Sequence, residues 1–204
     1  MRQTASIVLI LLLLLLPSSN VVAGSDKFVP VKPPAANVEG TRVTIEGTST
    51  IHDWKMEGPA IQGSIQSDPA TWVASSEPAA SVKVAIRVDS IRSDHNKMDN
   101  LMQKALKADS NPEIRYELLK AKVTKVAGDT IVMATNGKLT IAGATRDLAM
   151  DVTATRLDDA RYVITGEAPI RMPDYGIKPP TAMLGTIKTG PDVKISFRWV
   201  VGRS

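Results

Sequence analysis

The sequence predicts an all-β protein, an antiparallel β-barrel of about eight strands with one short α-helix between two of them. Three observations predict this fold. Apolar and polar residues alternate with a period of two in several segments, turn-forming residues separate these segments at short intervals, and a single segment has helical periodicity. Strands joined by such short turns pair antiparallel, because a parallel pair needs a long crossover connection. An eight-stranded barrel is either filled by its side chains or holds one small ligand, and the pattern leaves both open.

The alternating segments predict the strands and their inward faces. Five of them lie at residues 42–46, 82–89, 114–118, 148–153 and 193–199. Successive side chains of a strand point to opposite faces, so the apolar set should point into the barrel. The inward residues are therefore predicted to be Val43, Ile45, Val84, Ile86, Ile114, Tyr116, Leu148, Met150, Ile195 and Phe197.

The connections between strands are predicted from turn residues. Short turns are expected at Gly128-Asp129, Asn136-Gly137, Ala142-Gly143-Ala144 and Leu157-Asp158-Asp159. Residues 67–81, which contain two prolines and several small residues, predict an irregular loop.

One segment, residues 96–108, has helical spacing. Asp94 or Asn96 is expected to cap its first turn, and Asn111-Pro112 stops it. Its apolar face is either ordinary core or a cap over the barrel mouth, and consists of Met98, Leu101, Met102, Ala105 and Leu106.

The N-terminal residues predict export and a lead segment. Residues 1–23 have the features of a signal peptide, with Arg2, an apolar run at residues 7–16 and small residues up to Ala23. That run is too short to span a bilayer. We therefore expect cleavage near Ala23 and a periplasmic or secreted protein. Residues 24–39 are rich in proline and predict an extended arm, and residues 40–204 form the predicted barrel domain.

The amino-acid composition limits the covalent chemistry and the binding partners that the chain can have. The chain has no cysteine, which excludes a disulfide framework and a thiol nucleophile, and we expect no acyl anchor on an N-terminal cysteine. The net charge is +4, but the charges alternate in sign and form no basic block, so no nucleic-acid partner is predicted. The weak positive charge is compatible with transient contact with an anionic membrane. Methionine is frequent, with 8 residues against 3 Tyr and 2 Phe, and its flexible side chain suits irregular apolar ligands.

The sequence offers little for catalysis. Its only histidines are His52 and His95, beside Asp53 and Asp94. A triad with Ser49 would require neighbouring side chains to converge, yet on a strand the side chains of His52 and Asp53 point to opposite faces. A metal site built from both His-Asp pairs requires the two segments to meet. We predict no catalytic residues, no metal and no cofactor, hence no enzyme.

Four segments resemble motifs of a known family, in the same order. They are residues 47–54 (GTSTIHDW), residues 90–102 with Ser-Ile-Arg-Ser and Met-Asp-Asn-Leu-Met, residues 111–116 (NPEIRY), and residues 171–188 leading into 192–197. This order resembles the YceI-like family of periplasmic β-barrels associated with binding polyisoprenoid lipids. The chain departs from the family pattern at Lys55, Glu57 and Gly58-Pro59, which puts the length and lining of the second strand in doubt.

The resemblance implies an elongated, lipocalin-like barrel with an apolar tunnel. It also implies non-catalytic binding of a long apolar lipid, namely a polyisoprenoid, a quinone or a fatty-acyl chain. The implied ligand-binding residues are the ten inward residues above together with Trp54, Met98, Leu101, Met102 and Met172. Two alternatives stay open: a filled-core structural or interaction module without ligand, and a His-dependent metal or hydrolytic enzyme.

Overall fold

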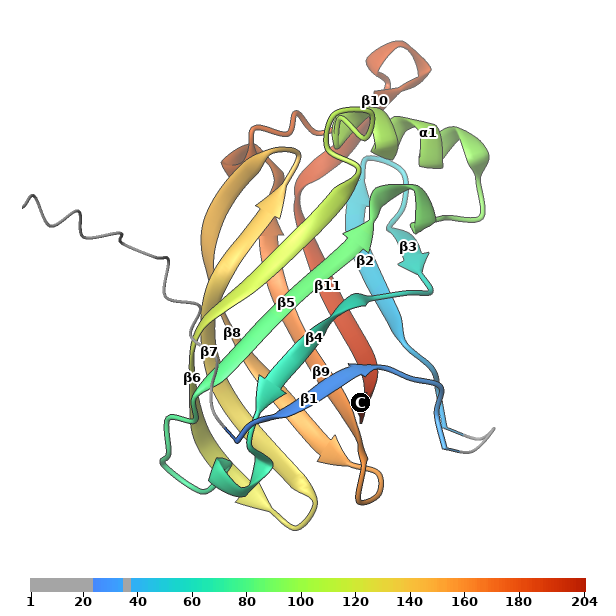
Figure 1. The fold of residues 1–204 in the computed structure, drawn as a ribbon. Coiled ribbons are helices and arrows are strands. Elements are labelled where there is room, and N and C mark those ends of the chain that lie inside the picture. Colours follow the sequence, from blue (N-terminus) through green and yellow to red (C-terminus); the bar gives the residue numbers. More distant parts are fainter. Residues whose placement is uncertain (1–23, 35–37) are drawn as a thin grey trace, which may run out of the picture.

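Eight antiparallel strands close into a barrel in the computed structural model, which describes residues 24–34 and 38–204 (Figure 1). The order around the barrel is β1, β4, β5, β6, β7, β8, β9 and β11, and β11 pairs with β1 to complete the ring. The predicted all-β barrel with one short helix is confirmed for these residues. The expected signal peptide, residues 1–23, lies outside the described part of the chain.

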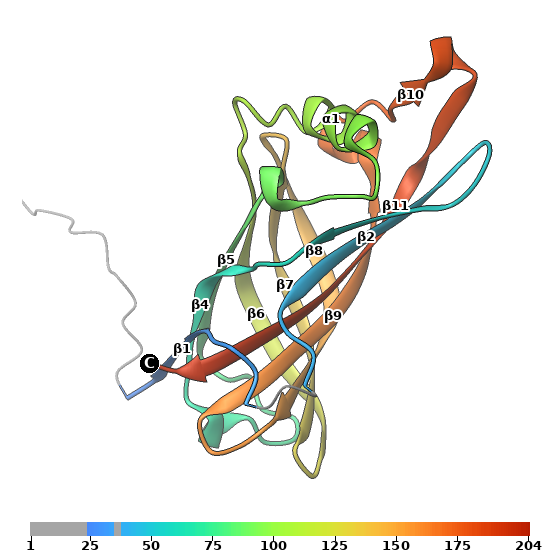
Figure 2. The same ribbon diagram turned by 90° about the vertical axis from the view of Figure 1, so that its right-hand side faces the viewer.

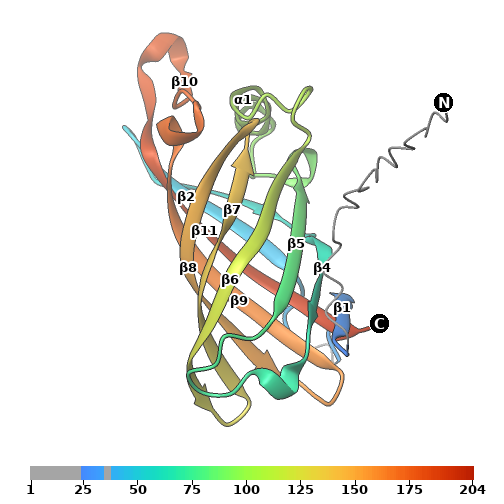
Figure 3. The same cartoon turned by 60° about the vertical axis from the view of Figure 1, so that its left-hand side comes forward.

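The strands differ widely in length, and those from β6 to β9 are long and tilted (Figure 3). Their bounds are β1 Asp26–Pro30, β2 Arg42–Ser49, β3 Trp54–Gly58, β4 Gln62–Ser67, β5 Ala80–Arg87, β6 Glu113–Ala127, β7 Thr130–Ile141, β8 Ala144–Arg156, β9 Arg161–Arg171, β10 Thr181–Ala182 and β11 Ile187–Arg203. The helical elements are η1 Pro69–Thr71, η2 Val88–Ser90, α1 Asn96–Ala105, η3 Met172–Tyr175 and η4 Met183–Gly185.

The Pro-rich lead differs from its prediction, because part of it is a barrel strand. β1 pairs with β4 through Phe28↔Ile65 and with the end of β11 through Phe28↔Arg203. Phe28 is 1% exposed and packs edge-on against Tyr162, with ring centroids 5.6 Å apart. Pro30 is tolerated because it is the last residue of the strand. The buried ring of Phe28 thus anchors part of the Pro-rich lead, which its composition predicted to be an extended arm.

A hairpin of β2 and β3 occupies the same edge of β11 as β1, but nearer the other end of the barrel. β2 pairs with β11 through Ile45↔Ile195, and β3 pairs with β2 through Ile45↔Met56. β3 then reaches the segment before α1, where the backbone of Glu57 and Arg92 exchanges hydrogen bonds of 2.7 and 2.8 Å. This bridge closes the upper end of the barrel, where β1 is absent.

The doubtful second strand is short. β3 ends at Gly58, before Pro59, and the chain resumes as β4 at Gln62. The charged residues that break the family pattern face outward, where Lys55 and Glu57 form an ion pair of 2.6 Å. Met56 between them is 2% exposed and faces the interior.

One predicted turn is wrong. Asn136-Gly137 lies within β7, whereas the other three predicted turns fall between strands. The glycine has a steric reason instead: a Cβ at Gly137 would overlap the ring of Tyr116 on the neighbouring strand. Glycine, which often marks a hairpin turn, is needed at this position because it leaves space for the Tyr116 ring.

The helix is confirmed over Asn96–Ala105, but its predicted cap is wrong. His95 occupies the N-cap position without a side-chain hydrogen bond. Asp99, within the helix and 4% exposed, instead accepts hydrogen bonds from the Ser93 backbone N–H (2.7 Å) and hydroxyl (2.8 Å). This buried carboxylate fixes the chain that leads into α1, and so fixes α1 over the end of the barrel (Figure 1).

We expect barrel closure by β1 to contribute strongly to stability. Phe28→Ala should lower the free energy of unfolding by about 3–5 kcal/mol, because it removes a buried aromatic ring and leaves a cavity. The control is Lys27→Ala, whose exposed side chain should change stability by less than about 0.5 kcal/mol. Urea denaturation followed by tryptophan fluorescence measures both. Equal stability of the two variants would contradict the role given to β1.

Candidate functional site

The barrel contains two cavities, one above the other. The inner cavity has a volume of about 160 Å³, and the outer one, beneath α1, about 620 Å³. Four isoleucines from four strands line both cavities and separate them: Ile45, Ile114, Ile170 and Ile195. The cavities are therefore adjoining parts of one apolar interior, which answers the question of a filled or hollow barrel in favour of a partly hollow one.

The ten residues predicted from alternation all line the inner cavity. They come from β2, β5, β6, β8 and β11, so the period-two pattern assigned the correct face to each strand. The remaining five predicted residues line the outer cavity: Trp54, Met98, Leu101, Met102 and Met172. Contact of these fifteen residues with a ligand stays a prediction.

Three aromatic rings in these walls lie over glycines of the neighbouring strand. The Trp54 ring covers Gly47, the Tyr116 ring covers Gly137, and the Phe197 ring covers Gly166. A Cβ at any of these glycines would collide with the ring above it. Each ring can therefore pack against the wall, which leaves the centre of the barrel open.

The lower end of the barrel is filled rather than hollow. Phe28, Trp72 and Tyr162 form an aromatic cluster there, and Trp199 is 2% exposed in the same core. The Trp72 indole N–H donates to the Ser67 hydroxyl at 2.9 Å. The sequence analysis did not predict this aromatic cluster. Trp72, a large apolar residue within the otherwise small-residue loop 67–81, indicates that part of the loop is buried.

The outer cavity is covered by one face of α1. This face both lines the cavity, through Met98, Leu101, Met102, Ala105 and Leu106, and packs against the buried core through all of these except Leu101. Trp54 also lines this cavity, and its indole N–H donates to the Thr48 carbonyl at 3.0 Å.

Methionines are concentrated around the two cavities. Met133 and Met150 line the inner cavity, and four more line the outer one: Met56, Met98, Met102 and Met172. Six of the eight methionines in the chain thus face the interior space. Their flexible thioether side chains can adapt to an irregular apolar guest.

The two His-Asp segments both border the outer cavity, which His52, Asp94 and His95 line. No group of three or more potential metal ligands occurs within residues 24–34 and 38–204. A triad at Ser49 is also absent from the geometry. The Ser49 hydroxyl donates to the His52 carbonyl (2.7 Å), and the His52 Nδ1 contacts the Asp53 carbonyl (2.7 Å), so no hydroxyl, imidazole and carboxylate are linked in sequence. His52 and Asp53 lie in the turn between β2 and β3, not on the strand from which their separation was argued.

Two buried polar atoms of the inner cavity have no hydrogen-bond partner among the described residues: the Tyr116 hydroxyl and the Trp199 indole nitrogen. Burial raises the pKa of Tyr116, and the nearby Thr135 hydroxyl opposes part of this effect. The Thr135 hydroxyl donates its own hydrogen bond to the Met150 carbonyl at 2.8 Å, so it leaves the Tyr116 hydroxyl without a geometric partner. An unpaired buried donor is costly to a protein, so each marks a place where an acceptor from outside the chain would be stabilised.

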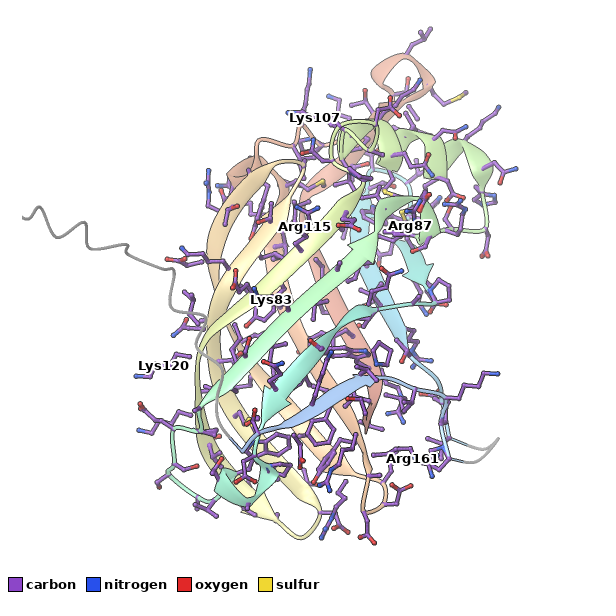
Figure 4. All side chains as sticks on the ribbon, in the orientation of Figure 1. Lys83, Arg87, Lys107, Arg115, Lys120 and Arg161 are labelled. Carbon is purple, nitrogen blue, oxygen red and sulfur yellow. The ribbon has the colours of Figure 1, made fainter. Side chains whose placement is uncertain are left out.

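The outer surface carries basic side chains on β5 and β6, and carboxylates pair with four of them (Figure 4). Lys83 pairs with Glu117 (3.7 Å), Arg115 with Glu113 (3.0 Å) and Lys120 with Glu77 (3.4 Å), and Arg87 pairs with Asp89. Such alternation resembles a solvated surface rather than a polyanion site. None of the helices in the described ranges has the length and apolar character that a membrane span requires.

Comparison with known proteins identifies related folds. The family model for the YceI-like domain matches residues 32–201. A comparison with curated protein sequences found no match. Among solved structures, BcnA of Burkholderia cenocepacia has a TM-score of 0.62 at 17% identity, covering 78% of this chain and 95% of its own.

Two further solved structures have similar barrels. A domain from Saccharophagus degradans, described as a polyisoprenoid binding domain implicated in plant cell wall breakdown, has a TM-score of 0.65 at 10% identity, covering 88% of this chain and 99% of its own. The YCEI protein of Campylobacter jejuni has a TM-score of 0.59 at 18% identity, covering 76% and 88%. At these identities the structural likeness establishes the fold.

The raised pKa of Tyr116 predicts a loss of stability in alkali. Above pH 10 the unfolded chain releases the phenolic proton at its ordinary pKa of 10.0, whereas the buried phenol of the folded chain keeps it. The unfolded state then binds fewer protons, so the free energy of unfolding falls as pH rises. Tyr116→Phe should reduce this fall while leaving stability at pH 8 equal or higher, because an unpaired hydroxyl is removed. Urea denaturation at pH 8, 10 and 11 measures it, and identical pH slopes would count against the burial argument.

Proposed function

The chain belongs to the YceI-like domain family, and from this premise we propose that its barrel binds a lipid with a long apolar chain. The ligand class is a polyisoprenoid, a quinone with such a tail, or a fatty-acyl chain. The ligand would occupy the inner cavity and extend between the four isoleucines into the outer cavity. The adjoining apolar cavities, closed at one end by aromatic rings and lined by methionine, are the observation that carries the proposal.

Exclusion of water supplies the affinity in this proposal. Each methylene group removed from water contributes about 0.8 kcal/mol, so about ten buried carbons contribute about 8 kcal/mol before the costs of association. The volume of the outer cavity, about 620 Å³, lies within the range usual for small-molecule sites. The ligand would enter from the mouth, since the base is filled by Phe28, Trp72 and Tyr162.

The comparisons support the ligand class without identifying the lipid. The Saccharophagus degradans domain is described as polyisoprenoid binding, and its fold resembles this one over 88% of the chain. A filled-core module without ligand is less consistent with the two cavities. We propose that the chain makes and breaks no bond, because the side chains of Ser49, His52 and Asp53 are not linked for proton transfer.

We also propose that the protein acts outside the cytoplasm, in the periplasm or after secretion. This part of the proposal depends on the sequence of residues 1–23, with cleavage near Ala23. Export would bring the barrel to a compartment where a long apolar lipid needs a carrier to cross water.

Lipid capture is tested by native mass spectrometry of the chain purified without detergent, followed by solvent extraction. We expect a discrete additional mass that extraction removes. Met150→Trp should reduce that mass at least tenfold, because the larger side chain occupies the inner cavity that Met150 lines. The matched control is Ala149→Trp on the same strand, where the side chain is exposed and uptake should be unchanged. Equal lipid content in both folded variants would contradict a ligand in the inner cavity.

The unpaired Tyr116 hydroxyl predicts a preference among lipids. A ligand whose oxygen reaches the inner cavity would accept a hydrogen bond from Tyr116, which is worth about 0.5–1.5 kcal/mol, or about two- to tenfold in affinity. Tyr116→Phe should weaken binding of an isoprenoid ketone by this factor and leave binding of the matching isoprenoid hydrocarbon unchanged. Competition against a fluorescent fatty acid measures both affinities. An equal effect on both lipids would show that the hydroxyl makes no such bond.

A further inference from the structure

Exposed apolar side chains gather at the mouth of the barrel. Among the described residues, six large hydrophobic side chains are exposed, and three of them lie on two loops at the mouth. Ile51 (61% exposed) is in the β2–β3 turn, and Met183 (73%) and Leu184 (109%) are in η4. We call these three residues the apolar tip. Figure 2 shows both loops projecting beyond the barrel, beside the end covered by α1.

The two loops are joined to each other. The Thr50 backbone N–H donates to the Lys188 carbonyl at 3.0 Å, and the Lys188 N–H donates to the Thr50 hydroxyl at 3.2 Å. The Thr50 hydroxyl also contacts the Thr186 carbonyl at 3.4 Å. Because these bonds tie the two loops together, the apolar tip is one surface rather than two unrelated loop ends.

The backbone of the tip is strained in a way that presents its side chains to solvent. Met183 and Leu184 both have left-handed conformations, with φ of 50° and 56°, which residues with a Cβ seldom adopt. Their side chains are too exposed to gain stability by packing within the chain. Backbone strain that no packing within the chain offsets is typical of segments whose conformation serves a binding event.

The inner side of the same loops forms part of the outer cavity. Ile51 belongs both to the tip and to the cavity wall, and Pro180, Ala182 and Ile187 line the cavity close to Met183 in sequence. An apolar chain that moved from the tip to the cavity would pass Ile51, which belongs to both. Contact with Ile51 would reduce the exposure to water that makes lipid transfer slow.

Basic side chains outnumber acidic ones in the two loops of the tip. Residues 175–191 contain Lys178 and Lys188 and no acidic residue, and the β2–β3 turn contains one acidic residue, Asp53. Both lysines are exposed, and neither takes part in any ion pair of the described chain. Unpaired lysines beside exposed aliphatic side chains are the combination that binds the interface of an anionic bilayer.

We propose that the apolar tip docks the barrel mouth on an anionic lipid bilayer, so that a lipid passes between membrane and cavity. Ile51, Met183 and Leu184 enter the interface, while Lys178 and Lys188 contact lipid headgroups. The transfer step rests on the proposed lipid-binding function, whereas docking itself does not. The two are therefore separable by experiment.

The test uses a double substitution, Met183→Asn with Leu184→Asn. Asparagine accepts the left-handed conformation, so the loop keeps its shape while the apolar surface is lost. The control is Val73→Asn, because Val73 is also exposed (57%) but follows η1 at the other end of the barrel (Figure 1). Both proteins are mixed with phosphatidylcholine vesicles, with and without phosphatidylglycerol, and the bound fraction is measured by flotation.

We expect the wild-type chain and Val73→Asn to bind the anionic vesicles, and the double variant to bind at least tenfold more weakly. Extraction of a fluorescent fatty acid from those vesicles should slow by a similar factor. Uptake of the same fatty acid from solution should be unchanged, because the cavities are intact. If the wild-type chain takes up no fatty acid from solution, the proposed lipid-binding function is contradicted. The flotation result would still test docking.

Two results would overturn the docking inference. One is equal flotation of the double variant and the wild-type chain. The other is no flotation of the wild-type chain with either vesicle, which would point to a protein partner for the tip instead of a membrane.

Discussion

The pairing of β11 with β9, β2 and β1 is the constraint on which this structure depends. Along one edge β11 pairs with β9, and along the other it pairs with β2 near the mouth and with β1 near the base. Its inward side chains run the length of the barrel: Ile195 lines both cavities, Phe197 lines the inner one, and Trp199 is buried at the base. Closure by this one strand removes the sheet edges, and it also encloses the space in which any ligand must lie.

What fills the barrel changes from its base to its mouth. Rigid aromatic rings pack against one another at the base, whereas isoleucine and methionine dominate the walls above. Three rings that line the cavities, those of Trp54, Tyr116 and Phe197, lie over glycines and so stay against the wall. The result is a rigid closed end and an adaptable apolar space, in which the few buried polar groups are available to a guest.

The mouth combines features that a filled barrel would not require. A buried carboxylate, Asp99, fixes the approach to α1, and one face of α1 covers the outer cavity. Across the mouth, the joined loops carry exposed apolar residues on the outside and line the cavity on the inside. Lipid binding and membrane docking would then use two sides of the same loops, which couples access to the cavity with contact at the membrane surface.

The sequence by itself determined the antiparallel β class, the helix and the inward face of each predicted strand, because alternation and helical spacing are local properties of the chain. It also pointed to the residues around the cavities, since the inward face of a barrel strand and the wall of its cavity are the same surface. Only the tertiary structure decided that Phe28 and its neighbours form the closing strand, that Gly137 serves a ring instead of a turn, and that the base is filled while the upper barrel is hollow. These outcomes depend on pairings and ring packing between residues far apart in sequence, such as Phe28 with Arg203, and a local pattern carries no information about such distant contacts.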